Sequence, residues 1–398
     1  MHYDAIIIGA GAAGLFCAIE AAKRGKSVLL IEHNAQVGRK IIISGGGRCN
    51  FTNTNVTAEN FISNNPHFCK SALARYTPDD FLMLIKKYRI PYYEKKLGQL
   101  FCRERSYSIV EMLLAECEKA GVRILTDCSV KRVDNESGSN RGENSNDPAR
   151  FSLNTTKGAF TCKKLVIATG GLSFPKIGAS GFGYDIARQF GHQVTELRPS
   201  LVALRFRNEK SFSKLSGISI AARVETKGNS FSENILFTHH GLSGPAVLQI
   251  SNYWQGSKPI SFDLLPDLDF VSELQKHRES RQTLVNFLSK YLPKRFVEEF
   301  TGRNFENKPL NQYSERELIR IAEKINCWQL VFGETEGWNK AEVTLGGVDT
   351  NEISSKSMES KKVQGLYFIG EILDVTGWLG GYNLQWAWSS AYVCGSSI

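Results

Sequence analysis

The fold of this chain is decided near its start, by the stretch Tyr3-Asp4-Ala5-Ile6-Ile7-Ile8-Gly9-Ala10-Gly11-Ala12-Ala13-Gly14. An apolar, β-branched run ends at Gly9, and a helix-favouring segment follows from Leu15 to Lys23. In the G-x-G-x-x-G spacing, Gly9 permits a tight turn and Gly11 lets a pyrophosphate approach the backbone, while Gly14 lets the helix pack closely on the strand. Free N–H groups at the start of that helix favour phosphate.

A second apolar strand, Ser27 to Ile31, ends in Glu32. An acid at this place can accept a hydrogen bond from an adenosine ribose. Strand, glycine loop, helix, strand and acid in this order predict a dinucleotide-binding unit. The alternative, a signal peptide, fits poorly because no basic segment precedes the apolar run and Asp4 interrupts its start.

The composition predicts a cytoplasmic protein without membrane association. A chain of 398 residues exceeds one ordinary core, so two or three domains are expected, and no apolar run is long enough to span a bilayer. The nine cysteines include no C-x-x-C pair, which argues against a disulfide framework, a zinc site or a dithiol reductase. The net charge of +9 suggests a polyanionic partner, yet the basic clusters at 276–281 and 290–295 are more typical of solvated helix faces.

A second glycine-rich segment runs from Gly38 to Asn53 and contains Gly45, Gly46 and Gly47 in succession. Three glycines in a row lose much conformational entropy on folding and supply no side chains for packing. They make sense where backbone lies flat against a ligand. The polar neighbours Ser44, Arg48, Asn50 and Thr52 suit a phosphate or a flavin ring.

Together with the opening fingerprint, this loop resembles the BaiN-like flavoproteins, a bacterial family that includes enzymes described as aminoacetone oxidases. It is more distantly similar to the fumarate reductase and aspartate oxidase flavoproteins, whose glycine loop at this place touches the flavin. The resemblance extends from residue 3 to about 395, and it includes the segments 344–348, 357–361, 370–374 and 380–387. It implies an FAD-dependent oxidoreductase with a Rossmann domain of the two-dinucleotide-binding type.

The part of the chain before residue 195 is expected to form most of that FAD domain. Residues 60–125 look mainly helical, and residues 135–150 form a polar insertion typical of a hairpin loop. A buried strand at 165–167 leads into Ala168-Thr169-Gly170-Gly171, a turn that the resemblance places beside the cofactor. The segment 178–183 is also glycine-rich, but no strand precedes it. A turn over the FAD or its substrate is therefore a better interpretation than a separate NAD(P)H site.

The middle of the chain differs from the first part in its pattern of apolar residues. Short strands at 202–206, 218–226, 231–237 and 260–264, separated by Gly, Ser and Pro, predict an inserted, β-barrel-like domain. A small helical subdomain at 266–326 interrupts it, and Ser314 with Glu317 forms a capping-box pattern there. The predicted α/β organisation is an FAD domain at 1–194 and 343–398, with the inserted domain at 195–342.

The C-terminal part returns to the cofactor. The strand at 365–369 ends in Gly370 and Glu371, and a carboxylate there can accept bonds from ribityl hydroxyls. The helix that starts at 381–384 can stabilise negative charge on a reduced flavin. The FAD is expected to be held without a covalent bond. The residues predicted to bind it are Gly9, Gly11, Ala12, Ala13, Gly14, Glu32, His33, Arg39, Lys40, Ser44, Gly45, Gly46, Gly47, Arg48, Cys49, Asn50, Val130, Ala168, Thr169, Gly170, Gly171, Gly370, Glu371, Asp374, Gly380, Gly381, Tyr382, Asn383 and Leu384.

The favoured function is two-electron flavin chemistry on a small organic molecule, with NAD(P)H or oxygen as the other redox partner. His239, Arg48 and Tyr382 are the candidate catalytic residues. His239 could transfer a proton near pH 7, although a histidine satisfied within a turn explains it as well. Cys49 is a candidate thiol, for which buried packing is the more ordinary explanation.

Two other functions stay open. Flavin-dependent tRNA-modifying enzymes share this broad fold and the chain is basic, so an RNA-associated flavoprotein is one alternative. Nucleic acid is nevertheless not the expected partner, because the sequence contains no contiguous basic–aromatic strip or RNA-binding tail. A flavin-binding redox sensor without turnover is the other alternative. The sequence indicates no particular oligomeric state.

Overall fold

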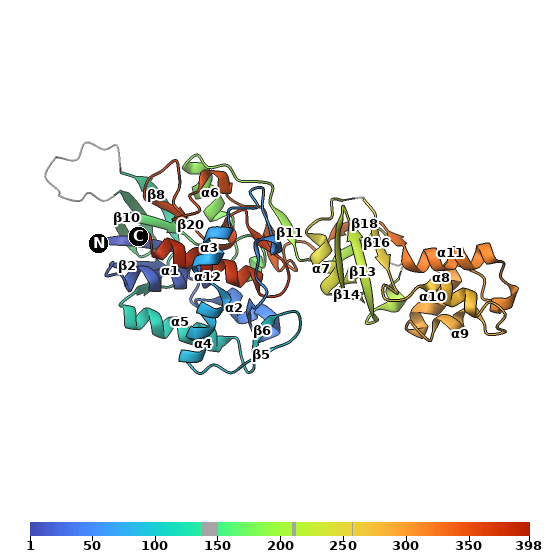
Figure 1. Cartoon of the computed structure of the whole chain (residues 1–398). Coiled ribbons are helices and arrows are strands. Elements are labelled where there is room, and N and C mark those ends of the chain that lie inside the picture. The colour runs from blue at the N-terminus through green and yellow to red at the C-terminus, as the bar shows by residue number, and fades with distance from the viewer. Residues whose placement is uncertain (137–149, 209–211, 257) are drawn as a thin grey trace. The chain divides into compact units, whose positions relative to one another are not determined.

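The fold is described from a computed structural model, for residues 1–136, 150–208, 212–256 and 258–398. The chain forms two compact units (Figure 1). Unit 1 consists of Met1–Arg198 and Val343–Ile398, and unit 2 consists of Pro199–Glu342. The sequence predicts the division after residues 194 and 342. Most of the predicted hairpin loop at 135–150 lies outside the described residues.

Unit 1 is built on a mixed sheet with the strand order β7-β2-β1-β10-β9-β8, in which β20 also pairs with β10. The parallel part pairs Ile8 of β1 with Ile31 of β2 and with Ile167 of β10. Because parallel strands end at one edge of a sheet, residues 9, 32, 168 and 369 come together there. The strands are β1 His2–Ile8, β2 Val28–Ile31, β7 Arg123–Leu125, β8 Val130–Asn135, β9 Phe151–Thr155, β10 Gly158–Ile167 and β20 Leu366–Phe368.

The main helices of unit 1 cover this sheet around an aromatic core. Trp388 of α12 packs edge-on against Phe16 of α1 and stacks on Phe81 of α4, with centroid distances of 5.9 and 4.4 Å. The helices α1 and α12 can pack closely because residue 395 is glycine. A larger residue would clash there, since its Cβ would lie 2.8 Å from the Cys17 carbonyl oxygen. The helices are α1 Ala12–Ala22, α2 Arg39–Ile43, α3 Lys70–Arg75, α4 Pro78–Lys87, α5 Tyr107–Ala120, α6 Phe182–Gln189 and α12 Tyr382–Gly395.

The expectation that residues 60–125 are mainly helical needs a correction. Two short antiparallel sheets also lie in or reach into this region, since strands of two to four residues are too short to show an alternating pattern. One has the order β3-β6-β5, with β3 Asn50–Asn53, β5 Tyr92–Glu94 and β6 Gln99–Cys102. The other pairs β4 Phe61–Ile62 with β21 Thr376–Gly377.

Unit 2 contains a seven-stranded antiparallel sheet with the order β17-β16-β13-β14-β15-β12-β18. Its two outer strands are separated in sequence by Val331 alone, so the sheet must curve back on itself at that point. Among the described residues no ladder joins β17 to β18. The strands are β12 Leu204–Phe206, β13 Ser219–Thr226, β14 Asn229–Phe237, β15 Gly241–Ser243, β16 Ile260–Asp263, β17 Trp328–Leu330 and β18 Phe332–Thr335.

Most helices of unit 2 lie within the predicted helical subdomain at 266–326. The capping box of α11 is confirmed, because the Ser314 side chain accepts from the Glu317 N–H and the Glu317 side chain accepts from the Ser314 N–H. The sequence analysis missed β15 and α7, which lie in a glycine- and proline-containing stretch. The helices are α7 Pro245–Ser251, α8 Phe270–Lys276, α9 Leu284–Leu288, α10 Lys294–Asn304 and α11 Glu315–Asn326.

A short ladder joins β11 Arg198–Ser200 to β19 Val343–Leu345. In the part of the chain that the structure describes, no helix is both long and apolar enough to cross a membrane.

Candidate cofactor-binding site

The first glycine loop has the geometry that its spacing predicts. Gly9 has φ +103°, and a Cβ there would lie 2.6 Å from the Ala168 carbonyl oxygen. A Cβ at Gly14 would collide with the Gly9 carbonyl oxygen. At Gly11, by contrast, a Cβ would meet no protein atom within 4 Å. Gly11 is the N-cap of α1 and has no side chain, so no side-chain cap occupies the first N–H groups of the helix.

Glu32 ties this loop to the end of β2. Its carboxylate accepts hydrogen bonds from the Ala10 N–H (2.9 Å) and from the Asn34 N–H and Nδ2 (2.9 and 2.8 Å). His33 Nδ1 lies 3.1 Å from the same carboxylate, and Arg39 donates to Asn34 Oδ1 at 2.8 Å. The predicted ribose-binding acid is thus oriented beside the glycine loop.

Val130 belongs to the same neighbourhood. The segment before it passes the end of β2, where the Cys128 N–H donates to the Glu32 carbonyl oxygen at 2.9 Å. The Asp127 N–H likewise donates to the Asn34 carbonyl oxygen at 3.0 Å. The start of β8 therefore lies next to the expected ribose position.

The second glycine loop is an exposed backbone surface. Gly45, Gly46 and Gly47 have φ of +58°, +66° and +85°, a left-handed conformation that favours glycine. At Gly46 and Gly47 a Cβ would meet no protein atom within 4 Å. The Ser44 hydroxyl donates to the Ile41 carbonyl oxygen at 2.7 Å and anchors the start of the loop. The loop therefore forms a cradle, which is an open space over the backbone at Gly46 and Gly47 that side chains at these two positions would fill.

The two residues after this loop differ in exposure. Arg48 is exposed, and its Nη1 donates to the Tyr93 hydroxyl at 3.5 Å. Cys49 is fully buried, and burial raises the pKa of its thiol far above the usual range. The thiol therefore stays protonated and packs as a small apolar side chain.

Glu371 gathers segments that are far apart in sequence. Its carboxylate pairs with Lys40 Nζ (2.5 Å) and accepts from the Ser173 hydroxyl (3.2 Å) and the Thr344 N–H (2.9 Å). Lys40 also donates to the Ser173 hydroxyl at 2.6 Å. A Cβ at Gly171 would lie 2.9 Å from Glu371 Oε1, so the 168–171 turn closes onto this carboxylate.

One atom of that turn lacks a protein partner. The Thr169 hydroxyl oxygen is buried and has no hydrogen-bond partner among the described residues. The hydroxyl lies against α6, since a Cβ at Gly183 would collide with its oxygen. It therefore explains why a glycine stands at position 183 rather than marking the cofactor's place.

The start of α12 forms the remaining wall. Gly380 and Gly381 have φ of +125° and +96°. The Asn50 amide accepts from the Gly381 N–H at 3.0 Å and donates to the Leu100 carbonyl oxygen at 3.0 Å. Asn383 uses its amide on Gly377, accepting from the N–H (2.9 Å) and donating to the carbonyl oxygen (2.8 Å). The Asn383 side chain therefore shapes the turn, and its backbone N–H is the group that remains for a ligand.

Two further predicted residues lie nearby. Tyr382 is 8% exposed and packs edge-on against Phe61, and burial raises the pKa of its hydroxyl. Asp374 accepts from the Asn64 N–H at 3.0 Å, and burial raises the pKa of its carboxyl. Both side chains therefore favour their protonated forms more than they would in water.

His239 is the predicted site residue that lies in unit 2. It is exposed in the turn between β14 and β15. The Thr238 hydroxyl organises this turn by accepting from the His240 and Gly241 N–H groups at 3.3 and 3.0 Å. The turn does not depend on the imidazole of His239.

We expect His239→Ala to keep its FAD content and its melting temperature, because the turn is held by Thr238 rather than by the imidazole. Turnover of the same variant tests proton transfer. A general acid–base group contributes about 10²–10⁴-fold, so a loss of this size with unchanged stability would establish the role. Normal turnover would remove His239 from the mechanism, and Thr238→Ala serves as the control that loosens the turn.

Sequence reasoning missed several groups that complete the cradle. Ser173, Thr344 and Asn34 hold the carboxylates of Glu371 and Glu32. Asn34 could have been noticed as an amide two residues after the predicted ribose acid. Ser173 and Thr344 carry no local signal, because their importance arises only where distant segments meet.

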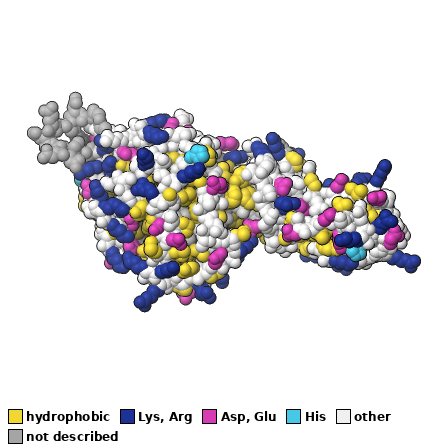
Figure 2. All heavy atoms as spheres, viewed as in Figure 1, with side chains coloured by type: hydrophobic (Ala, Val, Ile, Leu, Met, Phe, Trp, Pro, Cys, Tyr) yellow, Lys and Arg dark blue, Asp and Glu magenta, His cyan; other side chains and the backbone are white. Residues whose placement is uncertain are grey.

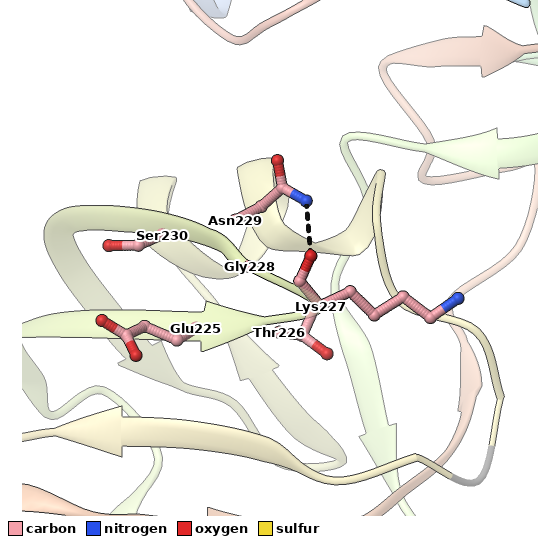
Figure 3. Close-up of a pocket in the computed structure, with 6 residues that line it drawn as sticks. All are labelled: Glu225, Thr226, Lys227, Gly228, Asn229 and Ser230. Atoms are coloured by element: carbon pink, nitrogen blue, oxygen red, sulfur yellow. Dashed lines mark hydrogen bonds between the residues drawn. The ribbon is translucent and has the colours of Figure 1, made fainter.

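A separate hollow in unit 2 carries no such set. It is lined by the six consecutive residues Glu225 to Ser230, at the turn between β13 and β14 (Figure 3). Asn229 Nδ2 donates to the Lys227 carbonyl oxygen there at 3.2 Å. A hollow built from one hairpin brings no groups together from different elements, and we assign it no role.

The cradle fits a dinucleotide carrying a flavin. Open backbone at Gly11, Gly46 and Gly47 and the uncapped start of α1 suit an extended ligand with phosphates at its middle. The fold and the site therefore define an FAD-binding oxidoreductase. Within this class the chain belongs to the HI0933-like protein family, whose Rossmann domain matches residues 3–397. The resemblance to the BaiN-like flavoproteins is thereby confirmed.

Named relatives match the chain over nearly its whole length. The chain is 50% identical over 402 residues to a ribosomal RNA dihydrouridine synthase of Haemophilus influenzae, covering 100% of this chain and 98% of the relative. It is 48% identical over 403 residues to the Escherichia coli protein of the same name, with the same coverage. It is 29% identical to a 3-dehydro-bile acid delta(4,6)-reductase of Clostridium scindens, covering 98% of this chain and 97% of the relative.

A solved structure shares the fold. A 3-ketosteroid-delta4-(5alpha)-dehydrogenase from Rhodococcus jostii aligns with a TM-score of 0.50 at 14% identity, covering 100% of this chain and 96% of that chain. At this identity the likeness concerns the fold alone.

Proposed function

We propose that this protein reduces uridine to dihydrouridine in ribosomal RNA, with FAD as its cofactor and a reduced nicotinamide as the electron source. The observation that carries the proposal is the similarity over the whole chain, at 48–50% identity, to two relatives of that name. From the sequence alone, a small organic substrate is the favoured expectation and RNA is an alternative.

The proposed reaction unites the relatives chemically. The C5–C6 double bond of uracil is conjugated to the C4 carbonyl, so it is an enone. The name of the 29% identical relative also describes reduction of double bonds in a substrate with a 3-oxo group. Saturating an enone adds a hydride equivalent at the carbon remote from the carbonyl and a proton at the nearer carbon. For uracil these are C6 and C5, and NAD(P)H supplies the two electrons.

FAD, when bound, supplies two-electron transfer between the nicotinamide and the double bond. The chain would hold it through the two glycine loops, Glu32 and the start of α12. The partial positive charge at the start of a 14-residue helix favours negative charge near Gly381. The exposed guanidinium of Arg48 can stabilise charge that develops on a substrate carbonyl oxygen. Tyr382 and His239 are the proposed proton donors.

The nicotinamide would visit the cradle without a nucleotide domain of its own. In the described residues, Gly178 follows a short 3₁₀ helix, Pro175–Ile177, rather than a strand. The geometry of that glycine-rich segment therefore differs from a Rossmann loop. A transient visit also suits a reductant that must leave before a bulky RNA substrate approaches.

Restoration of the modified nucleoside tests the proposal. We expect this chain, expressed in an E. coli strain deleted for its 48% identical relative, to restore dihydrouridine in ribosomal RNA, as measured by mass spectrometry of digested nucleosides. Purified protein with NADPH should form dihydrouridine on ribosomal RNA from the same strain. An FAD-loaded protein that does neither would refute the proposal.

A small conjugated ketone is the second candidate substrate, favoured by the bile-acid relative. A panel of enones without RNA, followed by NAD(P)H oxidation under anaerobic conditions, separates the two candidates. Turnover with any of these substrates would also exclude a redox sensor that binds flavin without catalysis.

A further inference from the structure

The sheet β3-β6-β5 has an outer face with both cations and aromatic rings. Tyr93 and Phe101 are paired across β5 and β6, and their rings stack with a centroid distance of 5.8 Å. Arg48 reaches the Tyr93 hydroxyl, and Lys95 Nζ lies 5.4 Å from the centre of the Phe101 ring. On the opposite face, Tyr92 packs against the buried Phe51. Tyr93, Arg48 and Lys95 therefore lie on the face opposite Tyr92, where Tyr93 and Lys95 cover the Phe101 ring, which is 7% exposed.

This face adjoins the flavin cradle. A Cβ at Gly45 would lie 2.9 Å from the Phe101 ring, so the ring lies directly against the glycine loop. The Cys102 N–H donates to the Arg48 carbonyl oxygen at 2.9 Å. Asn53 Nδ2 donates both to the Leu97 carbonyl oxygen (3.1 Å) and to the Gly380 carbonyl oxygen (2.8 Å). The β5–β6 hairpin is thus fastened to two walls of the cradle.

The tip of this hairpin is unusual. Leu97 is 61% exposed and has φ +51°, a strained conformation for a leucine. The exposed Lys95 and Lys96 precede it. Glycine would relieve the strain, and an exposed leucine gains little from burial. A strained, exposed leucine next to two lysines at the tip of this hairpin is suited to a contact with a partner.

The charge on the face seen in Figure 2 does not identify such a partner. On the face seen in Figure 2, Lys and Arg side chains are scattered among Asp and Glu side chains. At the hairpin, lysines and a pair of stacked rings lie next to the cradle. That combination suits single-stranded nucleic acid, since cations bind the phosphates and aromatic faces stack on bases.

We propose that the outer face of β3-β6-β5 and its tip bind an unpaired segment of RNA and deliver one base to the cradle. This inference rests on the proposed function, because an enzyme that acts on a base must take it out of its stack. Lys95 and Lys96 contact phosphates, Tyr93 supports a neighbouring base, and Leu97 acts as an apolar wedge that keeps the bases apart.

Binding of an oligouridylate to the flavin-loaded protein tests the surface. We expect Lys95→Ala/Lys96→Ala to weaken binding by about tenfold and to reduce the slope of log affinity against log salt by about 1.4, which is two contacts at about 0.7 each. We expect Leu97→Gly to bind the oligouridylate with unchanged affinity, because both lysines are kept. The variant should form dihydrouridine on ribosomal RNA about tenfold more slowly, because glycine adopts φ +51° but lacks the apolar side chain that keeps the bases apart. FAD content should not change in either variant.

The matched control is Lys276→Ala/Lys290→Ala, which removes two exposed lysines from the helical subdomain. Equal losses in both double variants, or no loss at the hairpin, would overturn the surface. The protein should bind the oligouridylate more weakly once it is annealed to oligoadenylate. Equal affinity for the single strand and the duplex would also contradict the proposed surface. If wild-type protein forms no dihydrouridine, the proposed function fails on its own. If it does while the hairpin variants match it, only the surface assignment fails.

Discussion

Gly11→Val is expected to abolish FAD retention while leaving the protein folded. Gly11 has φ −81° and ψ −166°, an extended conformation that valine adopts readily. No protein atom lies within 4 Å of its Cβ position, so the isopropyl group enters only the space above the loop. That space is where the pyrophosphate is expected to lie. Loss of cofactor would therefore arise from the ligand being excluded.

The other glycines of the two loops offer less clean tests. Valine at Gly14 would collide with the Gly9 carbonyl oxygen, and valine at Gly46 would be strained at φ +66°. Gly302→Val in α10 is the matched control, because its Cβ position is also open and its unit differs. The measurements are the flavin-to-protein ratio after purification and the melting temperature of the apoprotein. Full flavin occupancy of Gly11→Val would show that the loop was assigned wrongly.

The local part of the site could be predicted from the sequence for a physical reason. The roles of Gly9, Gly11 and Gly14 depend on neighbours within a few residues and on one adjacent strand, so spacing alone predicts them. Glu32 follows from the same short unit. The capping box of Ser314 and Glu317 is another interaction complete within four residues.

The rest of the cradle depends on contacts that spacing does not record. Lys40 meets Glu371 across 331 positions and Ser173 across 133 positions. The β5–β6 hairpin is different, because Tyr93, Lys95 and Phe101 lie close in sequence; what the sequence does not show is the strand pairing that stacks the two rings. Strands as short as β5 and β15 show too few residues for a period to be recognised.

Trp388→Ala is expected to destabilise unit 1 strongly. Trp388 is fully buried between Phe81 and Phe16, and its Nε1 donates to the Phe51 carbonyl oxygen at 2.9 Å. Removing a buried tryptophan costs about 3–5 kcal/mol of unfolding free energy. The unpaired carbonyl oxygen of Phe51 adds about 1 kcal/mol or more. For a unit of this size the melting temperature should fall on the order of 10 °C.

The same substitution should weaken the cofactor site, because Trp388 lies about two turns along the helix that begins at Gly381. Trp388→Phe separates packing from hydrogen bonding. It keeps a ring against Phe81 but loses the bond to the Phe51 carbonyl oxygen, for which about 1–3 kcal/mol is expected, and it leaves a smaller cavity than alanine does. Trp338→Ala, at a half-buried position in unit 2, is the control. Melting curves with and without added FAD give both effects, since a ligand that binds only the native state raises its melting temperature. A Trp388→Ala protein that melts within about 2 °C of the wild type, with an unchanged response to FAD, would show that the aromatic core does not position this wall of the cradle.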